Sequence, residues 1–564
     1  MEKRWKIKEP APAEIIERLS QDVKVNPVIA NLLWQRGITT YDEAKLFFRP
    51  QLEHLHDPFL MKDMDKAVAR IEEAISAGEK ILVYGDYDVD GTSAVALMYS
   101  FLKTIYENLD YYIPDRYKEG YGISKQGIDF ASENSFSLII ALDCGIKAID
   151  KVLYAKEKGI DFIICDHHLP GEEIPNAAAV LDPKRRDCSY PYKELSGCGI
   201  GFKLIQALAQ KKNIPLENLQ AFLDLVVVSI AADIVPITGE NRILAYYGLK
   251  RLNNSPREGI RAMLELTHMK KELTITDIVF VIGPRINAAG RMESGKKAVE
   301  LLISSSADHA IESGQYLNKN NSDRRDLDIY STQQALAMIA ESTLLQQRKT
   351  TVLFDPSWHK GVIGIVASRL TETYYRPTIL LTQSNGVVSG SARSVKDYDI
   401  YEALSACSDL LEQFGGHKFA AGLTLKPENV EAFQKKFEEV VSSSITDEML
   451  VPEIEIDASI ALHEITPSFY NIIKQFAPFG PGNMNPVFQT ENVSDRGYAS
   501  IVGANHLKLD LVQKEVKFPA IAFGLAAHYD HVAKKNMLTV CYNIREQEWD
   551  GKTYLQLQVK DLKK

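Results

Sequence analysis

Three aspartates stand at alternate positions directly after a short apolar run. Asp86, Asp88 and Asp90 follow residues 81–84, a run typical of a strand buried on both faces. Because alternate side chains of an extended segment point the same way, we expect the three carboxylates to converge where that strand ends. Like charges this close repel one another, and Mg²⁺ or Mn²⁺ takes such hard oxygen ligands. The competing interpretation is a solvated acidic turn with Asp as a helix cap.

Further carboxylates and two imidazoles follow later apolar runs. Asp143 ends the run 137–143, and Asp166, His167 and His168 close the run that starts at 161. Ligands gather at the carboxyl ends of the strands in open α/β sheets, so this pattern indicates a metal site. Adjacent side chains on a strand diverge, so we expect one imidazole to bind metal and the other to face substrate. Asp233 ends an apolar helical run, where an unpaired carboxylate is unfavourable and a buried cation would explain it.

The sequence therefore predicts two divalent ions, Mn²⁺ or Mg²⁺, at this sheet edge. The predicted ligands are Asp86, Asp88, Asp90, Asp143, His167 and Asp233. Asp143 is the expected bridging ligand. Asp166 is expected to orient other groups and to tune His167 rather than to bind metal.

Three later stretches combine small residues with groups that suit phosphate. Small residues allow close backbone approach, and Arg and Asn supply donors for phosphate oxygens. The candidates are Arg285, Asn287 and Arg291 in 283–292, Ser391 and Arg393 in 389–394, and Gly415, Gly416 and His417. The Gly-Gly-His stretch is expected to be a loop whose backbone N–H groups bind an anion.

Apolar runs alternate with helical patterns, which predicts two α/β domains joined by a long helix, followed by a small β-barrel of the OB-fold type. The expected boundaries are an N-terminal helical segment at 1–75, a catalytic α/β domain at 76–305, a connecting helix at 306–348, a second α/β domain at 349–445 and the barrel at 451–564. The N-terminal segment is expected to pack on the first domain. The charges at 323–328 are interpreted as a solvated helix face.

Composition limits the class of protein. The chain has 564 residues and a net charge of −10, which argues against a generally basic nucleic-acid binder but allows a local basic groove. Its six cysteines include no CxxC pair, as expected in a reducing compartment. No apolar signal core or membrane-spanning run is found. We predict a cytoplasmic protein, with a monomer as the expected state.

The motifs together resemble a known group of enzymes. GDYDVDGTSA (85–94), ALDCG (141–145) and CDHH (165–168), in this order, resemble the DHH phosphoesterase superfamily. GPRINAAGRM (283–292), SGSARS (389–394), GGHKFAAG (415–422) and PFGPGNMNPVF (478–488) are similar to its RecJ family of single-stranded-DNA exonucleases. The resemblance covers roughly residues 75–564. Met484 stands where that family usually has Pro.

This resemblance implies a metal-dependent exonuclease that degrades single-stranded DNA from 5′ to 3′ in DNA repair and recombination. It implies that His168 and Arg285 contact the scissile phosphate, with Asp166 beside them. It also implies that Arg116, Ser391 and Arg393 hold the strand end, including a 5′ phosphate. A single-strand-binding protein and a RecQ-type helicase are the partners that it suggests.

Three alternatives stay open from the sequence. DVDGT also matches the haloacid-dehalogenase phosphatases, in which Asp88 would be a nucleophile, although that reading gives no role to Asp143 or the paired histidines. Relatives within the DHH superfamily cleave short oligonucleotides, cyclic dinucleotides or pyrophosphate. Others are catalytically silent replication scaffolds that have lost their metal ligands.

Overall fold

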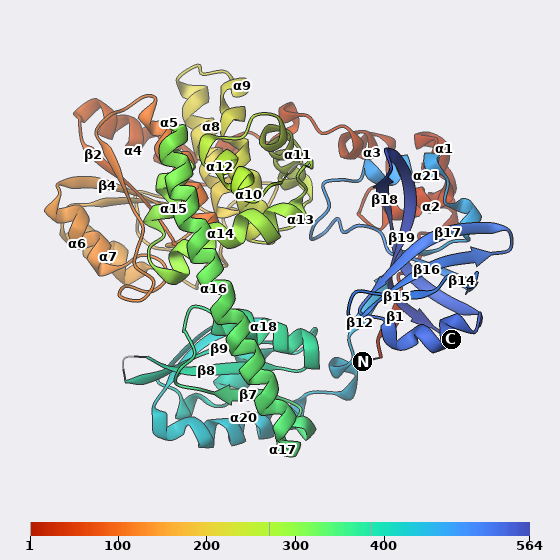
Figure 1. Cartoon of the computed structure of the whole chain (residues 1–564). Coiled ribbons are helices and arrows are strands. Elements are labelled where there is room, and N and C mark those ends of the chain that lie inside the picture. Colours follow the sequence, from red (N-terminus) through yellow and green to blue (C-terminus); the bar gives the residue numbers. More distant parts are fainter. Residues whose placement is uncertain (1, 270, 385) are drawn as a thin grey trace.

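The computed structural model describes residues 2–269, 271–384 and 386–564, and it forms three bodies (Figure 1). Two α/β units are joined by the long helix α16 (Ala307–Glu341), and a β-rich unit lies beside them. The first described residues and the C-terminal residues both lie at the β-rich unit. The predicted fold class, two α/β units with a connecting helix and a C-terminal β-rich unit, is confirmed.

A five-stranded parallel sheet forms the centre of the first unit. Its strands are β2 (Lys80–Gly85), β3 (Leu109–Tyr112), β4 (Phe136–Leu142), β5 (Asp161–Cys165) and β6 (Ala179–Leu181), in the order β3-β2-β4-β5-β6. Along β4, Leu138 and Ile140 face one hydrophobic core, whereas Ile139 and Ala141 face the other. Because both faces bury apolar side chains, the strands are unbroken apolar runs in the sequence.

Helices cover both faces of this sheet. One face carries α4 (Met64–Ala77), α5 (Val89–Lys103) and α8 (Gly197–Lys211), and the other carries α6 (Lys125–Glu133) and α7 (Ile149–Glu157). Outside the first group lie α9 (Leu216–Leu219), α10 (Leu223–Ala232), α11 (Gly239–Asn254), α12 (Glu258–Leu266), α13 (Ile275–Asp277), α14 (Gly283–Met292) and α15 (Lys296–Ile303). Every residue of α10 except its last is buried, as its apolar sequence predicts. Its C-terminal end delivers Asp233 to the site described below.

The second unit holds a mixed sheet in the order β10-β11-β9-β8-β7. Its elements are β7 (Thr351–Phe354), α18 (Ile363–Tyr374), β8 (Thr378–Ser384), β9 (Val387–Arg393), α19 (Ile400–Ser405), β10 (Gln413–His417), β11 (Ala420–Leu425) and α20 (Val430–Ser444). The predicted loop at Gly415, Gly416 and His417 is wrong, because these residues form the end of β10 and pair with β11. Gly416 has φ +148°, and a Cβ there would lie 2.4 Å from the Ala420 carbonyl oxygen, so glycine permits the tight hairpin.

The connecting helix is not purely solvated along its charged stretch. Asp328 is fully buried and pairs with Arg369 at 2.7 Å. Arg324 is half-buried and donates to Asn321. The expectation of a solvated face is therefore wrong for these two positions, because α16 packs on α12, α14 and α18 and its polar side chains face other polar groups there. Among the described residues, no helix combines the length and apolarity needed to cross a bilayer.

The β-rich unit is a closed barrel. Its strands are β13 (Ala458–Ser459), β14 (Phe488–Asp495), β15 (Ser500–Val502), β16 (His506–Gln513), β17 (Val516–Phe523), β18 (Leu538–Trp549) and β19 (Lys552–Lys563). They follow the order β13-β14-β18-β19-β17-β16-β15, and β14 also pairs with β16. That extra pairing closes the sheet and removes an exposed edge. The short helices α21 (Pro467–Lys474) and α22 (Tyr529–Ala533) pack against it.

The N-terminal segment packs mainly on this barrel and not on the first unit, which corrects the sequence-based expectation. β1 (Arg4–Ile7) pairs in parallel with β12 (Glu453–Ile456). Helices α1 (Ala13–Val23), α2 (Pro27–Trp34) and α3 (Tyr41–Phe48) share one hydrophobic core with the barrel and α21. Only the end of the segment, with α4, joins the core of the first unit. Apolar helical periodicity specifies a buried face but not the partner that covers it.

A single buried guanidinium links the first unit to this barrel assembly. Arg242 of α11 donates to the Phe47 carbonyl at 2.9 and 3.0 Å and to the Phe476 carbonyl at 2.7 Å. It also donates to the carbonyls of Gln475 and Ala477. These oxygens lie at or just beyond the C-terminal ends of α3 and α21, where backbone acceptors lack helical partners and carry negative potential. Burial lowers the pKa of Arg242 to about 9.

We expect Arg242→Met to lower the thermal midpoint of the protein. The change removes a costly buried charge, but it leaves several buried carbonyls without donors, and that loss of about 3 kcal/mol outweighs the gain. Differential scanning calorimetry measures the shift. Arg261→Met removes an exposed guanidinium that pairs with Glu258 in the same unit, and it is expected to change stability by less than about 0.5 kcal/mol. Equal midpoints for both variants would contradict the assignment.

Candidate metal centre and anion-binding cavity

The acid run after β2 forms a turn that leads into a helix. β2 ends at Gly85, and Asp88 caps α5 by accepting a hydrogen bond from the Gly91 backbone N–H at 3.0 Å. The expectation of three alternating side chains on an extended segment is therefore wrong, because the free amides of the first helical turn draw Asp88 into the cap. The turn is tight. A Cβ on Gly91 would lie 2.5 Å from the Asp86 carbonyl oxygen, so the acidic side chains still come together.

Asp90 lies in the first turn of α5 and joins three helices. Its carboxylate accepts hydrogen bonds from the backbone N–H groups of Gly197 and Cys198, both at 2.7 Å, and from the Ser229 hydroxyl at 2.8 Å. The two amides open α8, where helical donors have no partner within the helix. Asp90 is thereby fixed between α5, α8 and α10.

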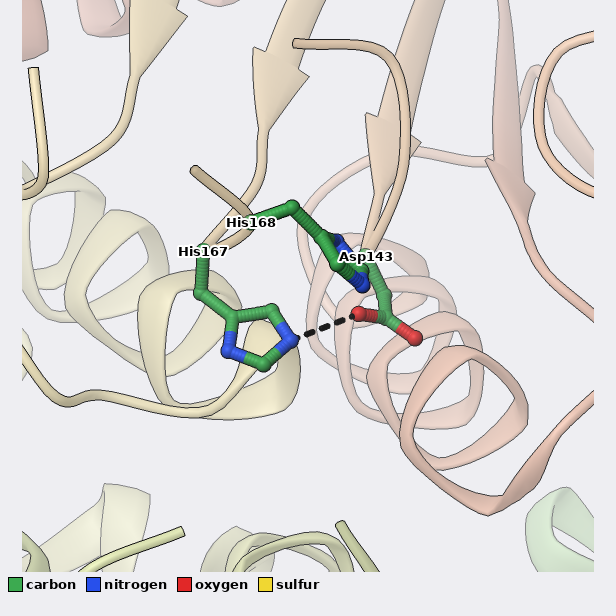
Figure 2. Close-up of side chains that lie close together, drawn as sticks. All are labelled: Asp143, His167 and His168. Carbon is green, nitrogen blue, oxygen red and sulfur yellow. Dashed lines mark ion pairs between the residues drawn. The ribbon is translucent and has the colours of Figure 1, made fainter. Parts of the chain in front are cut away.

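Asp90, Asp143 and Asp233 surround the imidazole of His167. His167 Nε2 lies 3.2 Å from Asp143 Oδ1, 3.5 Å from Asp233 Oδ2 and 3.8 Å from Asp90 Oδ2. Figure 2 shows the rings of His167 and His168 turned toward the Asp143 carboxylate. Two overlapping groups, Asp143–His167–His168 and Asp90–His167–Asp233, each place three ligand atoms within 4.8 Å of one another. Side chains far apart in the sequence thus meet at one end of the sheet.

Several ligand atoms of this cluster are buried without a partner. Asp86 Oδ2, Asp143 Oδ1 and both ring nitrogens of His167 make no hydrogen bond within the part of the chain that the structure describes. A buried polar atom without a partner costs free energy, so native proteins rarely leave several in one place. Carboxylate oxygens are ligands that both Mn²⁺ and Mg²⁺ prefer, and a neutral imidazole is a common ligand of first-row transition-metal ions such as Mn²⁺. The donor set therefore fits divalent cations.

The electrostatics of the cluster agree with this fit. Burial and the neighbouring charge of Asp88 raise the pKa of Asp86 well above its usual value. Burial and the charges of Asp90 and Asp88 raise the pKa of Asp143 in the same way and that of Asp233 to about 8. Burial lowers the pKa of His167, which keeps the ring neutral, the form that binds metal. Without added positive charge, the carboxylates of the folded site repel one another.

The backbone at Asp143 is unusual. This residue has φ +60°, in the left-handed region that non-glycine residues rarely occupy. A Cβ on Gly197 would lie 2.6 Å from Asp143 Cβ, so only glycine lets α8 approach the carboxylate this closely. Ile234, directly after Asp233, also has φ +59° and is 63% exposed. Strained backbone at one predicted ligand and directly after another is typical of a functional site.

The two histidines do not diverge as expected. Their ring centroids are 4.6 Å apart, because β5 ends at Cys165 and the histidines lie in the turn that follows. Asp166 Oδ1 lies 2.7 Å from His168 Nδ1, so this aspartate orients the ring of His168. It contacts His167 only through the backbone N–H, which donates to it at 2.8 Å. Burial disfavours the charged ring, but the hydrogen bond and charge of Asp166 outweigh it and raise the pKa of His168 to about 9.

A cavity of about 820 Å³ opens beside the cluster, between the two α/β units. Asp88 lines it on one side, and Ser391, Arg393 and the β10–β11 hairpin line it on the other. Arg116 and Arg291 also line it. None of the three guanidiniums forms an ion pair with a carboxylate of the described chain. Burial and mutual repulsion lower the pKa of Arg291 to about 10 and also lower the pKa of Arg393. Such a cavity favours an anion.

The cavity brings together most of the predicted substrate residues. Ser391 Oγ accepts a hydrogen bond from Arg393 at 3.0 Å. Gly415 lines the wall where a Cβ would meet no other atom, and Gly416 and His417 lie beside it. Arg291 reaches across to the second unit and donates to the Gly361 carbonyl at 3.1 Å.

Arg285 and Asn287 are not among the residues that line the cavity. Arg285 donates to Asn318 Oδ1 at 3.0 Å and to the Val281 carbonyl at 2.7 Å. Its pKa is lowered by burial and by Arg325 and Arg324 of α16. Tyr121 and Lys360 also line the cavity, although no sequence motif pointed to them. The glycines on either side of Tyr121 were the signal for a residue presented by a tight turn.

Comparison with known proteins agrees with this architecture. Three protein-family models match: "DHH family, N-terminal domain" at residues 80–230, "DHHA1 domain" at 347–443 and "RecJ OB domain" at 456–561. The single-stranded-DNA-specific exonuclease RecJ of Bacillus subtilis is 36% identical over 99% of this chain and 70% of its own length. The RecJ of Salmonella typhimurium is 31% identical over 95% of this chain and 96% of its own.

Among solved structures, the fold is similar to that of the RecJ of Thermus thermophilus in complex with Mn²⁺. The TM-score is 0.86 at 28% identity, over 100% of this chain and 79% of that one. The resemblance of the motifs and the fold class are both confirmed by these matches. The chain belongs to the RecJ family of single-stranded-DNA-specific exonucleases, within the DHH superfamily.

Proposed function

We propose that this chain is a metal-dependent exonuclease that degrades single-stranded DNA, starting at the 5′ end. One observation carries the proposal. A buried cluster of carboxylate and imidazole groups, several without a hydrogen bond, opens at Asp88 onto a cavity lined by three guanidiniums that form no ion pair within the described residues. Divalent cations would balance the charge of the carboxylate cluster, and a phosphate would balance the charge of the guanidiniums. The relatives bear the name single-stranded-DNA-specific exonuclease, and the Thermus structure contains Mn²⁺.

The metal ligands in this proposal are the six predicted from the sequence: Asp86, Asp88, Asp90, Asp143, His167 and Asp233. Their contacts and unpartnered atoms support the assignment. Two Mn²⁺ or Mg²⁺ ions would activate water and neutralise charge on the phosphate and the leaving oxygen. Asp166 holds His168 Nδ1, which directs His168 Nε2 away from Asp166. Nε2 lies 3.3 Å from the Tyr121 hydroxyl, and a phosphate oxygen would bind beside that hydroxyl.

The guanidiniums provide the binding of the strand end. Arg116 lies over the Tyr87 ring at 5.1 Å, and Arg393 is fixed by Ser391 and Ser368. We assign Arg116, Ser391 and Arg393 to the terminal 5′ phosphate, with Arg291 and the β10–β11 hairpin beside them. Arg285 is assigned to the scissile phosphate, and Asn287 to the strand near it. Arg285 would then leave its contact with Asn318 when DNA binds. A single strand entering this enclosed cavity by its end accounts for exonuclease action.

The alternatives have less support. A nucleophilic Asp88 is disfavoured because its carboxylate caps α5. A silent scaffold is disfavoured because the chain retains every carboxylate and imidazole of the motifs. A dinucleotide phosphodiesterase leaves the closed C-terminal barrel without a role. We further infer a cytoplasmic protein, since all six cysteines are free and buried. The single-strand-binding protein and RecQ-type helicase stay predictions from the resemblance.

Digestion of end-labelled oligonucleotides tests the proposal. The substrates are single strands labelled at either end, blunt duplex and duplex with a 5′ tail, each with Mn²⁺, Mg²⁺ or chelator. We expect metal-dependent release of mononucleotides from the 5′ end and stalling where a tail meets duplex. Release from the 3′ end first would refute the polarity. Equal digestion of blunt duplex would refute the single-strand preference.

We expect Asp143→Asn to stabilise the metal-free protein while abolishing its response to Mn²⁺. The amide removes one of several repelling charges, and Asn tolerates the left-handed backbone. Relief of about 1 kcal/mol or more corresponds to a rise of about 2–4 °C in thermal midpoint for a domain of this size. Calorimetry with and without Mn²⁺ measures this rise, and nuclease activity is expected to fall by about 10³-fold or more.

The control for this variant is Asp409→Asn, which neutralises an exposed carboxylate paired with Lys436 in the second α/β unit. It is expected to leave the metal-free midpoint, the Mn²⁺ response and the activity unchanged. If Asp143→Asn keeps the rise in midpoint with Mn²⁺, Asp143 is not a metal ligand.

We expect Arg393→Gln to raise the KM for a 5′-phosphorylated strand by about tenfold or more, because a charge-assisted contact to phosphate is lost. For a strand with a 5′ hydroxyl, we expect a much smaller rise in KM. Steady-state digestion of the two substrates in parallel measures the difference. Arg348→Gln, which changes an arginine of the same unit outside the cavity, is the control. An equal loss on both substrates would place the 5′ phosphate elsewhere.

A further inference from the structure

Tyr121 occupies the part of the cavity wall between the metal cluster and the guanidiniums. Its side chain is 54% exposed, and it lines the cavity with Asp88, Arg116 and Arg291. It lies on the loop between β3 and α6. None of the roles assigned above uses it, although its exposed aromatic ring lies among the charged groups of this cavity.

The loop holds Tyr121 in one place. Gly120 and Gly122 have φ of +88° and +79°, so the chain turns sharply on either side of Tyr121. The Gly122 carbonyl accepts a hydrogen bond from the buried hydroxyl of Tyr84 at 2.9 Å. The Gly122 backbone N–H donates to Asp86 Oδ1 at 3.4 Å. The position of Tyr121 is therefore tied directly to a predicted metal ligand.

The same loop is fixed at its other end by an acidic side chain. Glu119 accepts hydrogen bonds from the Asp115 backbone N–H at 2.8 Å, from the Ser124 hydroxyl at 2.5 Å and from the Tyr112 hydroxyl at 3.0 Å. These contacts bring the start and the end of the loop together. The loop thus presents its exposed ring from a rigid base, as a positioning element requires.

The hydroxyl of Tyr121 contacts the histidine assigned to the scissile phosphate. It lies 3.3 Å from His168 Nε2, while Asp166 Oδ1 lies 2.7 Å from His168 Nδ1. One hydrogen bond leaves an imidazole free to swing about its Cβ–Cγ bond. Contacts at both nitrogens fix the plane of the ring. Tyr121 and Asp166 thus hold His168 from opposite sides.

The ring of Tyr121 faces the place where the end nucleotide must lie. It stands edge-on to Tyr87, with ring centroids 6.0 Å apart at 87°, and the Arg116 guanidinium lies 5.1 Å from the same Tyr87 ring. Tyr121 thus contacts His168, and it shares Tyr87 as a neighbour with Arg116. A nucleotide that places one phosphate at each of these groups would bring its nucleoside against the exposed ring.

We propose that Tyr121 is a positioning residue for the terminal nucleotide: its hydroxyl fixes His168, and its ring packs against the nucleoside. The inference rests on the proposed function, because it uses the assignment of His168 and Arg116 to the two phosphates. The two roles separate chemically. The hydroxyl acts through His168 on turnover, whereas the ring acts on binding of the strand end.

Three variants test the proposal with a 5′-phosphorylated single strand. Tyr121→Phe removes only the hydroxyl and is expected to lower kcat by about tenfold with KM unchanged. Tyr121→Leu also removes the aromatic face and is expected to raise KM and the Kd measured by anisotropy in chelator by about tenfold or more. Tyr154→Phe, which removes a phenolic hydrogen bond to Asp129 away from the cavity, is expected to match the unchanged protein.

The outcomes separate the inference from the proposed function. Unchanged kcat in Tyr121→Phe would refute the role of the hydroxyl, and equal Kd values for the Phe and Leu variants would refute the role of the ring. The kcat result assumes an active unchanged protein. If that protein digests no strand with any metal, the proposed function fails and takes the role of the hydroxyl with it. The Kd comparison still decides the role of the ring, because it needs no turnover.

Discussion

Mutual repulsion among buried carboxylates is the constraint on which this structure depends. Five carboxylates converge at one end of a parallel sheet: those of Asp86, Asp88, Asp90, Asp143 and Asp233. Few hydrogen-bond donors of the protein offset their negative charge. A folded chain keeps such a cluster only if the rest of the fold holds it in place. Here Gly91 and Gly197 let the backbone approach closely, and the amides that open α8 hold Asp90. These features are costly to the free protein and useful only with bound cations.

The sheet and the main ligand motifs could be predicted from the sequence, because both depend on local patterns. Doubly buried strands are short apolar runs, and the carboxyl ends of parallel strands meet at one edge. The meeting of Asp143 and His167 followed from that rule, and the expectation for Asp233 followed from the cost of an unpaired carboxylate at a helix C-terminus. The backbone conformation of the stretch that holds Asp86, Asp88 and Asp90 could not be predicted in this way. Its extended geometry and the helix cap of Asp88 compete within a few residues, and the unsatisfied amides of α5 decide between them.

What the sequence could not provide depends on partners distant in the chain. The faces of α1 to α3 are readable as apolar, yet nothing local indicates that the C-terminal barrel covers them. In the sequence, Arg242 is an ordinary charged residue of a helix. Its role depends on the ends of two helices from another part of the chain, which lie beside it only in the folded protein. The Gly-Gly-His stretch has the composition of a loop, and only its pairing with β11 makes it a strand. The proposed role of Tyr121 depends on its contact with His168, which lies 47 residues later in the chain.

The cations of the second unit and the anions of the first do not neutralise each other, and the fold explains why. Arg393 is held on β9 by Ser391 and Ser368, while the carboxylates are held at the sheet end of the other unit. α16 packs against both α14 and α18 and so sets the distance between them. Arg116 and Arg291 belong to the first unit, but they lie over Tyr87 and against Gly361 rather than beside an acid. A phosphodiester with divalent cations supplies negative charge to one half and positive charge to the other. Neither half can meet that need alone, so in the proposed function the separation of the charges selects the ligand.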